Sequence, residues 1–141
     1  MPGIQKIQNL GRQGGLPSST MDAQRQQLID AVRAASADGR LLRLRGGGTK
    51  DFWGQSRNAE VLDTRAYSGI ISYEPSELVV TVRGGTPLAE LEAALAAKGQ
   101  CLAFEPPHFG PGATVGGMVA SGLSGPARAT AGAVRDYVLG A

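Results

Sequence analysis

Two glycine-rich segments constrain this chain more than any other feature of its sequence. The first, RGGGTK (Arg45–Lys50), follows the apolar run Leu41–Leu44, and the second, GATVGGMVASGLSGP, spans Gly112–Pro126. Glycine has no Cβ, so its backbone can approach a ligand closely, and consecutive N–H groups in such a bend can form a concave nest for an anion. Two nests in one small domain predict an extended anionic ligand held at two places. A dinucleotide with a central pyrophosphate fits that description.

Composition excludes other interpretations of this glycine content. The chain has 21 glycines in 141 residues, about twice the usual share of roughly 7%. Much of this excess lies in the two segments, which contain eight glycines, and the glycines form no repeat, which excludes collagen-like and linker sequences. The net charge is only +2 and aromatic residues make up 5%, so the basic stripe with interleaved aromatics that is typical of nucleic-acid binders is absent. We therefore expect no nucleic-acid partner.

The single cysteine, Cys101, cannot form an internal disulfide framework or a cysteine-rich metal site. Its apolar neighbours predict a buried strand residue rather than a reactive thiol, and we predict no metal site. No stretch approaches the roughly 20 apolar residues of a membrane helix. Residues 1–16 lack the basic start and apolar core of a secretory signal. We therefore expect a cytoplasmic protein, with a peripheral position at the inner membrane as the alternative location.

The apolar pattern predicts an α+β order of elements. Residues 1–19 show no periodicity and are expected to form a disordered leader. A helix is predicted from a cap at residue 18, 19 or 20 to about residue 37, with Gly39 as its stop. Short strands are predicted over 41–44, 60–63, 69–73, 78–82 and 101–104. The third and fourth of these strands are expected to form an antiparallel hairpin around a turn at 74–77.

A second helix is predicted over 88–98, with Thr86 as its cap, Pro87 at its first position and Gly99 as its stop. Residues 105–111 contain three prolines and predict a rigid extended loop. One or two helical turns are predicted over 115–123, and the start of a further strand over 136–139. Because the sequence ends in this strand-like run, whereas domain boundaries favour polar, flexible stretches, we expect the domain to be truncated at its C-terminus.

The glycine segments do not specify their ligand by themselves. RGGGTK lacks the spacing and the Gly-Lys-Ser/Thr ending of a Walker A loop, and it also lacks the spacing and following helix of the Rossmann motif. A structural turn explains it as well as a ligand loop does. In the second segment, the small residues Gly116, Gly117, Ala120, Ser121 and Gly122 favour packing against a flat ligand, although a close helix crossing would use them too.

These segments and the sequence between them resemble a known family. RGGGTK, the run LDTRAYSGIISYEPSELVVTVRGGTPLAELEAALAAKG and the run EPPHFGPGATVGGMVASGLSGP followed by VRDYVLG are similar to the FAD-binding domain of the vanillyl-alcohol oxidase and p-cresol methylhydroxylase superfamily. The resemblance extends from about residue 22 to the C-terminus, and the last run is specific to the E-type FAD subunits of bacterial glycolate oxidases. It implies an incomplete FAD-binding PCMH-type domain of two small α/β subdomains over residues 20–141.

The resemblance also implies roles for individual residues. The first loop would meet the pyrophosphate through backbone donors and a threonine hydroxyl, and the second loop would lie on the other side of the cofactor. Further residues would follow the ribityl and pyrophosphate region, and two valines would lie near the adenine or flavin edge. The implied cofactor-binding residues are Arg45, Gly46, Gly47, Gly48, Thr49, Lys50, Thr114, Val115, Gly116, Gly117, Ser121, Gly122, Ser124, Val134 and Val138.

A charge-assisted contact to phosphate is expected from Arg45 or Lys50, and the alternative is that both are exposed residues at the end of a strand. Some superfamily members attach flavin covalently through a histidine or cysteine. His108 lies outside the glycine loops, so we expect it to pack or cap, and we expect FAD to be noncovalent.

The activity implied by the resemblance is oxidation of a small 2-hydroxy acid such as glycolate to glyoxylate. Electrons would pass through the flavin to an iron–sulfur partner subunit, beside a paralogous FAD subunit. The carboxylate-binding arginine and the histidine expected for this reaction would come from a substrate domain, so no catalytic residue is identified and the chain alone is expected to be inactive. The alternatives are a noncatalytic module that docks a paralogous flavoprotein and, with weaker support, a UDP-sugar reductase.

Overall fold

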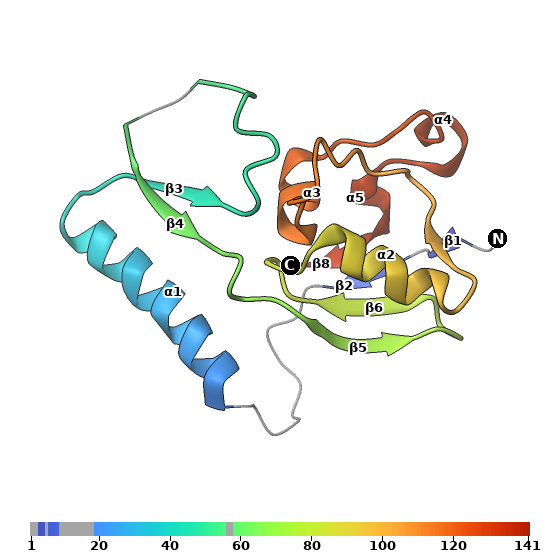
Figure 1. The fold of residues 1–141 in the computed structure, drawn as a ribbon, viewed down its shortest axis with the longest axis horizontal. Helices are drawn as coiled ribbons and strands as arrows, with labels where there is room; N and C mark the ends of the chain where they lie inside the picture. Colours follow the sequence, from blue (N-terminus) through green and yellow to red (C-terminus); the bar gives the residue numbers. More distant parts are fainter. Residues whose placement is uncertain (1–2, 5, 9–18, 56–57) are drawn as a thin grey trace.

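The computed structural model describes residues 3–4, 6–8, 19–55 and 58–141 (Figure 1). Helices and strands alternate along the chain, which confirms the predicted mixed α/β character. In chain order the elements are β1 (Gly3–Ile4), β2 (Lys6–Gln8), α1 (Ser19–Ala37), β3 (Leu42–Arg45), β4 (Glu60–Asp63), β5 (Ile70–Glu74), β6 (Val79–Val82), α2 (Leu88–Ala96), β7 (Cys101–Leu102), α3 (Val115–Ser121), α4 (Arg128–Ala131), α5 (Val134–Tyr137) and β8 (Val138–Gly140).

The strands form three small sheets. The largest has the order β5-β6-β2-β8, with β5 antiparallel to β6 and with β2 parallel to both of its neighbours. β3 pairs in parallel with β4, and β1 pairs in parallel with β7. The predicted hairpin is confirmed, because Glu74 lies opposite Val79 across the turn. In Figure 1, α1, β3 and β4 form one group, and the helices α2 to α5 gather around the four-stranded sheet.

Two short strands lie within the segment for which the sequence predicts a disordered leader. β2 lies between β6 and β8, and its Ile7 is opposite Val80 on one side and Val138 on the other. A strand of three residues is too short to show a hydrophobic period, and its partners come from remote parts of the chain. The expectation of disorder therefore does not hold at residues 3–4 and 6–8. Residues 1–2, 5 and 9–18 lie outside the described part of the chain.

One hydrophobic core lies where α2 and its neighbours meet the four-stranded sheet. Leu88, Leu91 and Leu95 recur at helical spacing along α2 and are fully buried with Val80 and Val82 of β6. Burial contributes about 1.5–3 kcal/mol for each large apolar side chain, so this cluster is the main source of stability. Its other members are Leu102, Phe104, Ala113, Val115, Met118, Val134 and Tyr137.

The start of α2 differs from the prediction. Pro87 is the N-cap residue rather than the first helical residue, and no side chain caps the helix. The fully buried Thr86 hydroxyl accepts a hydrogen bond from the Gly69 N–H at 2.8 Å and donates one to the Arg83 carbonyl at 2.6 Å. Because a buried hydroxyl without partners costs free energy, these bonds hold Thr86 to the start of β5 instead of to the helix.

Both long helices are followed by a glycine with left-handed φ, as predicted: Gly39 has a φ of 65° and Gly99 a φ of 69°. After α1, the Arg40 N–H reaches back to the Ala35 carbonyl at 2.8 Å. This is a Schellman motif, which supplies a partner to a carbonyl at the helix end. α2 ends at Ala96, two residues before the predicted end at residue 98.

The bounds of the helices and strands nearer the C-terminus differ more from those predicted from the sequence. β7 contains only residues 101–102 of the predicted strand, and its Cys101 is half-buried rather than buried. The strand expected from residue 136 begins at residue 138, because residues 134–137 form α5. In α5, the Asp136 carboxylate accepts a hydrogen bond from the Ala133 N–H at 2.8 Å, which favours a helical start over a strand. No helix in the described part of the chain has the length and apolar character needed to cross a bilayer.

Gly85 sets how the turn before α2 packs on the turn after β4. A Cβ at Gly85 would overlap the Thr64 carbonyl oxygen and lie 2.7 Å from that of Tyr67, whereas a Cβ at Gly84 would meet nothing closer than 3.7 Å. Backbone oxygens cannot rotate away, so we predict that Gly85→Ala lowers the free energy of unfolding by about 3 kcal/mol. The matched Gly84→Ala change should cost less than about 1 kcal/mol.

Urea unfolding followed by circular dichroism measures both free energies. Equal values for the two alanine variants would contradict this account of the turn.

Candidate functional site

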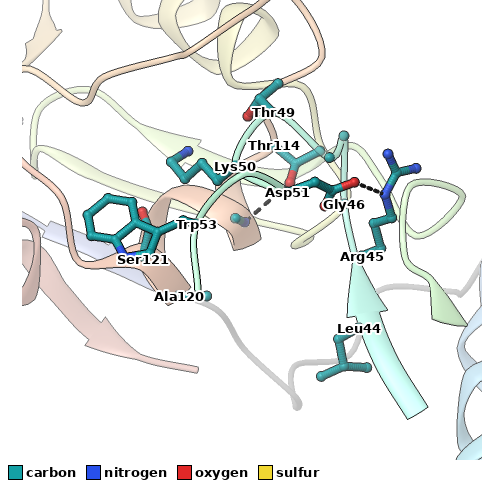
Figure 2. Close-up of a pocket in the computed structure, with 13 residues that line it drawn as sticks. Leu44, Arg45, Gly46, Thr49, Lys50, Asp51, Trp53, Thr114, Ala120 and Ser121 are labelled. Carbon is teal, nitrogen blue, oxygen red and sulfur yellow. Dashed lines mark hydrogen bonds and ion pairs between the residues drawn. The ribbon is translucent and has the colours of Figure 1, made fainter. Parts of the chain in front are cut away.

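The two glycine segments line one pocket of about 470 Å³, a volume typical of small-molecule sites. β3 leads directly into the first segment, and α3 carries the second (Figure 2). The chain therefore brings together the two segments that the sequence predicts to share a ligand. The lining residues are Leu44, Arg45, Gly46, Gly47, Gly48, Thr49, Lys50, Asp51, Trp53, Thr114, Gly117, Ala120 and Ser121.

Several glycines of the two segments serve contacts between backbones. A Cβ at Gly47 would overlap the Gly112 carbonyl oxygen, and one at Gly46 would overlap the Thr114 hydroxyl. These glycines are expected from the sequence to admit a ligand, and in the structure their missing side chains also let the first segment pack directly on the second. Gly116 also lies at a close backbone contact, in this case with the turn before α2, because a Cβ there would lie 2.8 Å from the Gly84 carbonyl oxygen.

Three successive backbone donors of the second segment, those of residues 115–117, are already used inside the protein. The N–H groups of Val115 and Gly116 donate to the carbonyls of Thr86 and Gly84, at 2.9 and 2.8 Å. The N–H of Gly117 donates to the side-chain hydroxyl of the residue that caps α3, at 3.2 Å. These three donors tie α3 to the turn before α2 and to its own cap, so that the expected contribution of the second segment to an anion site does not come from them.

The first segment keeps its backbone donors available. None of the five successive N–H groups of residues 46–50 donates to an acceptor among the residues that the structure describes. Gly48 has a φ of 70°, and its carbonyl accepts a hydrogen bond from the Asp51 N–H at 3.1 Å, which closes the bend. Successive amides around a left-handed residue form a concave anion site. We name the N–H groups of residues 46–50 the amide nest.

The two cations of the pocket differ in their partners. Arg45 Nε donates to the Asp51 carboxylate at 2.7 Å, so its charge is balanced within the loop. Lys50 makes no ion pair with any described residue, and its Nζ lies 5.6 Å from the centre of the Phe109 ring. Partial burial lowers the pKa of the Lys50 ammonium group, because desolvation disfavours its charged form. An anion in the pocket would offset the desolvation of the Lys50 ammonium group, whereas the charge of Arg45 is already balanced by Asp51.

α3 divides the predicted residues of the second segment between different places. Thr114, Gly117 and Ser121 line the pocket together with the first segment. These residues follow one another at intervals of three and four, so they share one face of the helix. Val115 and Gly116 line a separate hollow of about 220 Å³.

The predicted residues nearer the C-terminus do not line the pocket. Gly122, Val134 and Val138 line a further hollow of about 470 Å³, which also includes Arg128. Ser124 lines none of these spaces, and its hydroxyl accepts a hydrogen bond from the Val134 N–H at 3.0 Å. The structure therefore gives Ser124 a role in holding the loop before α5.

Ala120, which the sequence marks as a small residue suited to a flat ligand, also lines the pocket, together with three residues that sequence reasoning missed: Leu44, Asp51 and Trp53. Trp53 is 59% exposed, and its backbone N–H closes a turn by donating to the Lys50 carbonyl at 2.9 Å. An aromatic pair directly after a glycine loop is unusual in a chain with only 5% aromatic residues. That signal could have drawn attention to Trp53 before the fold was known.

The chain's one histidine and one cysteine lie outside the lining of the pocket. His108 Nε2 lies 3.0 Å from Glu92 Oε2, and Cys101 lies in β7. Over residues 3–4, 6–8, 19–55 and 58–141, no group of three or more His, Cys, Asp or Glu side chains is placed to hold a metal ion.

Comparison with known proteins supplies a family for this arrangement. Residues 23–141 match the model of a family described as FAD binding domain. Glycolate oxidase subunit GlcE of Escherichia coli (strain K12) is 50% identical to the chain over 115 residues, which are 82% of this chain and 33% of that relative. The chain thus spans about a third of the length of the curated relative that it matches. Because the family match covers most of the chain, both glycine segments and the pocket between them, this protein belongs to the FAD-binding domain family.

Proposed function

We propose that this chain provides FAD binding to a 2-hydroxy-acid oxidoreductase of the glycolate oxidase type, and that the amide nest holds the diphosphate of FAD. The observation that carries the proposal is the run of five N–H groups, beside a pocket, that have no acceptor among the described residues. A diphosphate requires such donors, because burying its charge without partners is very costly. Lys50 adds a cation and Thr49 a hydroxyl at the same pocket.

The second segment serves as the facing wall of the site. The Gly117 N–H donates to the Thr114 hydroxyl, so Gly117 contributes shape, whereas the Thr114 hydroxyl keeps its own proton to donate. Ser121 donates its hydroxyl proton to the Met118 carbonyl at 2.9 Å and keeps acceptor capacity toward the pocket. In this proposal Val115, Gly116, Gly122 and Ser124 support the wall, Val134 and Val138 lie toward the adenine or flavin edge, and the whole is a PCMH-type domain of two subdomains.

The name of the relative supports the reaction class: it is a glycolate oxidase subunit. The proposed reaction oxidises a small 2-hydroxy acid such as glycolate to glyoxylate, and FAD, when bound, supplies the redox chemistry. The residues of this chain bind and orient the cofactor and shield its diphosphate from water. The proposal includes a paralogous FAD subunit and an iron–sulfur subunit as partners, and a location in the cytoplasm or peripherally at the inner membrane.

A second candidate function, a noncatalytic assembly module, is favoured by one observation. Leu41, Leu44 and Val61 on or beside the β3–β4 sheet are 61%, 71% and 44% exposed, and exposed apolar patches mark protein interaction sites. FAD titration of the purified chain separates the two candidates. A chain that serves only in assembly does not bind FAD, whereas a cofactor domain does.

The proposal predicts that a carboxylate in the pocket weakens FAD binding. Ala120 is exposed on α3 and lines the pocket, so Ala120→Asp adds a negative charge that faces the diphosphate without a backbone clash. Coulomb repulsion of about 2 kcal/mol should raise the Kd roughly 30-fold. The matched control is Ala93→Asp, because Ala93 is exposed on α2 and lies outside the pocket lining. Calorimetric titration with FAD measures both, and equal Kd values would contradict the placement of the diphosphate.

The lowered pKa of Lys50 predicts a pH dependence of binding. A lysine whose pKa is lowered loses its proton at a lower pH than an ordinary lysine, so the pocket loses this cation as pH rises. FAD affinity should therefore fall as the pH is raised into the alkaline range. Lys50→Met should bind about tenfold more weakly at neutral pH, the loss of one charge-assisted contact, and its affinity should depend less on pH.

Lys98→Met is the control, because Lys98 is exposed and does not line the pocket. If Lys50→Met and Lys98→Met give the same Kd at every pH, Lys50 does not contact the cofactor.

Noncovalent attachment predicts complete release of the cofactor on denaturation. The two side-chain types that anchor flavin covalently in related proteins are represented here by His108 and Cys101, and neither lines the pocket. After acid precipitation of the FAD-loaded chain, we expect the flavin absorbance in the supernatant and a colourless pellet. A yellow pellet that withstands washing would show a covalent bond.

A further inference from the structure

An exposed aromatic patch lies beside the pocket. Of the seven aromatic residues in the chain (one Trp, three Tyr and three Phe), three form this patch: Phe52, Trp53 and Phe109, which are 69%, 59% and 51% exposed. The rings of Phe52 and Phe109 meet edge to face with their centres 5.5 Å apart. Large aromatic surfaces left in water favour a ligand or partner that covers them.

Trp53 is the member of the patch that lines the pocket. Two successive turns bring it there: the Asp51 N–H donates to the Gly48 carbonyl at 3.1 Å, and the Trp53 N–H donates to the Lys50 carbonyl at 2.9 Å. In the view of Figure 2, the indole ring lies on the left and Gly46 on the right, with the Lys50 side chain between them. The flat indole face and the amide nest therefore belong to one continuous space.

A remote loop supports this placement. Phe109 has a φ of 54°, a left-handed conformation that is uncommon for a bulky residue. This backbone places the Phe109 ring against both Phe52 and the Lys50 ammonium group, whose Nζ is 5.6 Å from the ring centre. Unusual backbone conformations persist where surrounding contacts hold them, and they gather at ligand sites. The contacts of Phe109 thus hold the turn that carries Trp53.

We propose that Trp53 stacks on a flat heteroaromatic ring of the bound FAD. This inference rests on the proposed function, because a ring covalently joined to a diphosphate in the amide nest must lie close to the nest. Aromatic stacking holds a flat ring by its face and needs no dedicated donor, and Ala120 and Leu44 add apolar surface to the same pocket. FAD carries two such rings, adenine and isoalloxazine, and both have the chemistry that an indole face recognises.

The test compares Trp53→Ala and Trp53→Phe with the unchanged 141-residue chain in calorimetric titrations with FAD. Trp53→Ala should raise the Kd for FAD about tenfold, the effect of one lost base–aromatic stack, and Trp53→Phe should raise it less than about threefold because a ring remains. Neither change should alter the affinity for inorganic diphosphate, which has no ring. Titrations with ADP and with FMN then identify the ring, because only the fragment that meets Trp53 should lose affinity in Trp53→Ala.

Leu41→Ala is the matched control, because Leu41 is a large apolar residue that is 61% exposed, close to the 59% of Trp53, and it does not line the pocket. It should leave the Kd for FAD within about twofold. A second readout needs no variant, because the chain has a single tryptophan. Whichever of ADP and FMN carries the ring that meets Trp53 should, when bound, reduce the quenching of its fluorescence by acrylamide.

The outcomes separate this inference from the proposed function. If the unchanged chain does not bind FAD, the proposed function fails. If FAD binds but Trp53→Ala and Leu41→Ala have equal Kd values, and acrylamide reaches the indole equally in the bound state, the stacking inference is overturned and the patch instead faces a protein partner. If Trp53→Ala does not fold, Trp53→Phe and the acrylamide measurement still decide the question.

Discussion

The backbone contact between Gly47 and Gly112 is the interaction on which the site depends. The hydrophobic core takes its buried members from β6 onward, so it does not include the β3–β4 sheet. The first glycine segment is held against the core-bearing part by loop contacts, in which Gly47 packs on Gly112 and Gly46 packs on the Thr114 side chain. A side chain at either position would separate the two walls of the pocket. Glycine is therefore required here by the protein's own backbone before any ligand is present.

The two glycine segments contribute differently to the site, although the sequence predicts anion-binding amides in both. The amides of Val115 and Gly116 are bonded to the turn before α2, so α3 is fixed in place as a wall. The amides of residues 46–50 have no such partners in the described part of the chain, and these residues line the pocket. A rigid wall opposite a set of oriented donors is a preorganised site, in which little freedom is lost on binding. Lys50, with its desolvated charge, supplies the long-range attraction for an anion.

The sequence was sufficient for features with local causes. α1 and α2 follow from apolar residues at helical spacing and from Gly39 and Gly99, and the hairpin follows from two β-branched runs around a turn. It was insufficient for β1, β2 and α5, because such short elements depend on remote partners or on a single capping carboxylate. At the site, residue type identified the glycine loop, but the availability of each N–H depends on carbonyls far along the chain. Trp53 was missed for the same reason, since only the turns after Lys50 bring it to the pocket.

The place of β2 in the largest sheet has a consequence for the order of folding. Residues 6–8 pair with β6 on one side and with residues 138–140 on the other, so β2 cannot complete its pairing until all of the chain between them has been synthesised. Closing such a large loop is entropically costly and slow. Until then one edge of β2 presents unpaired backbone groups to other chains. During synthesis, this nascent edge is therefore open to mispairing with strands of other chains.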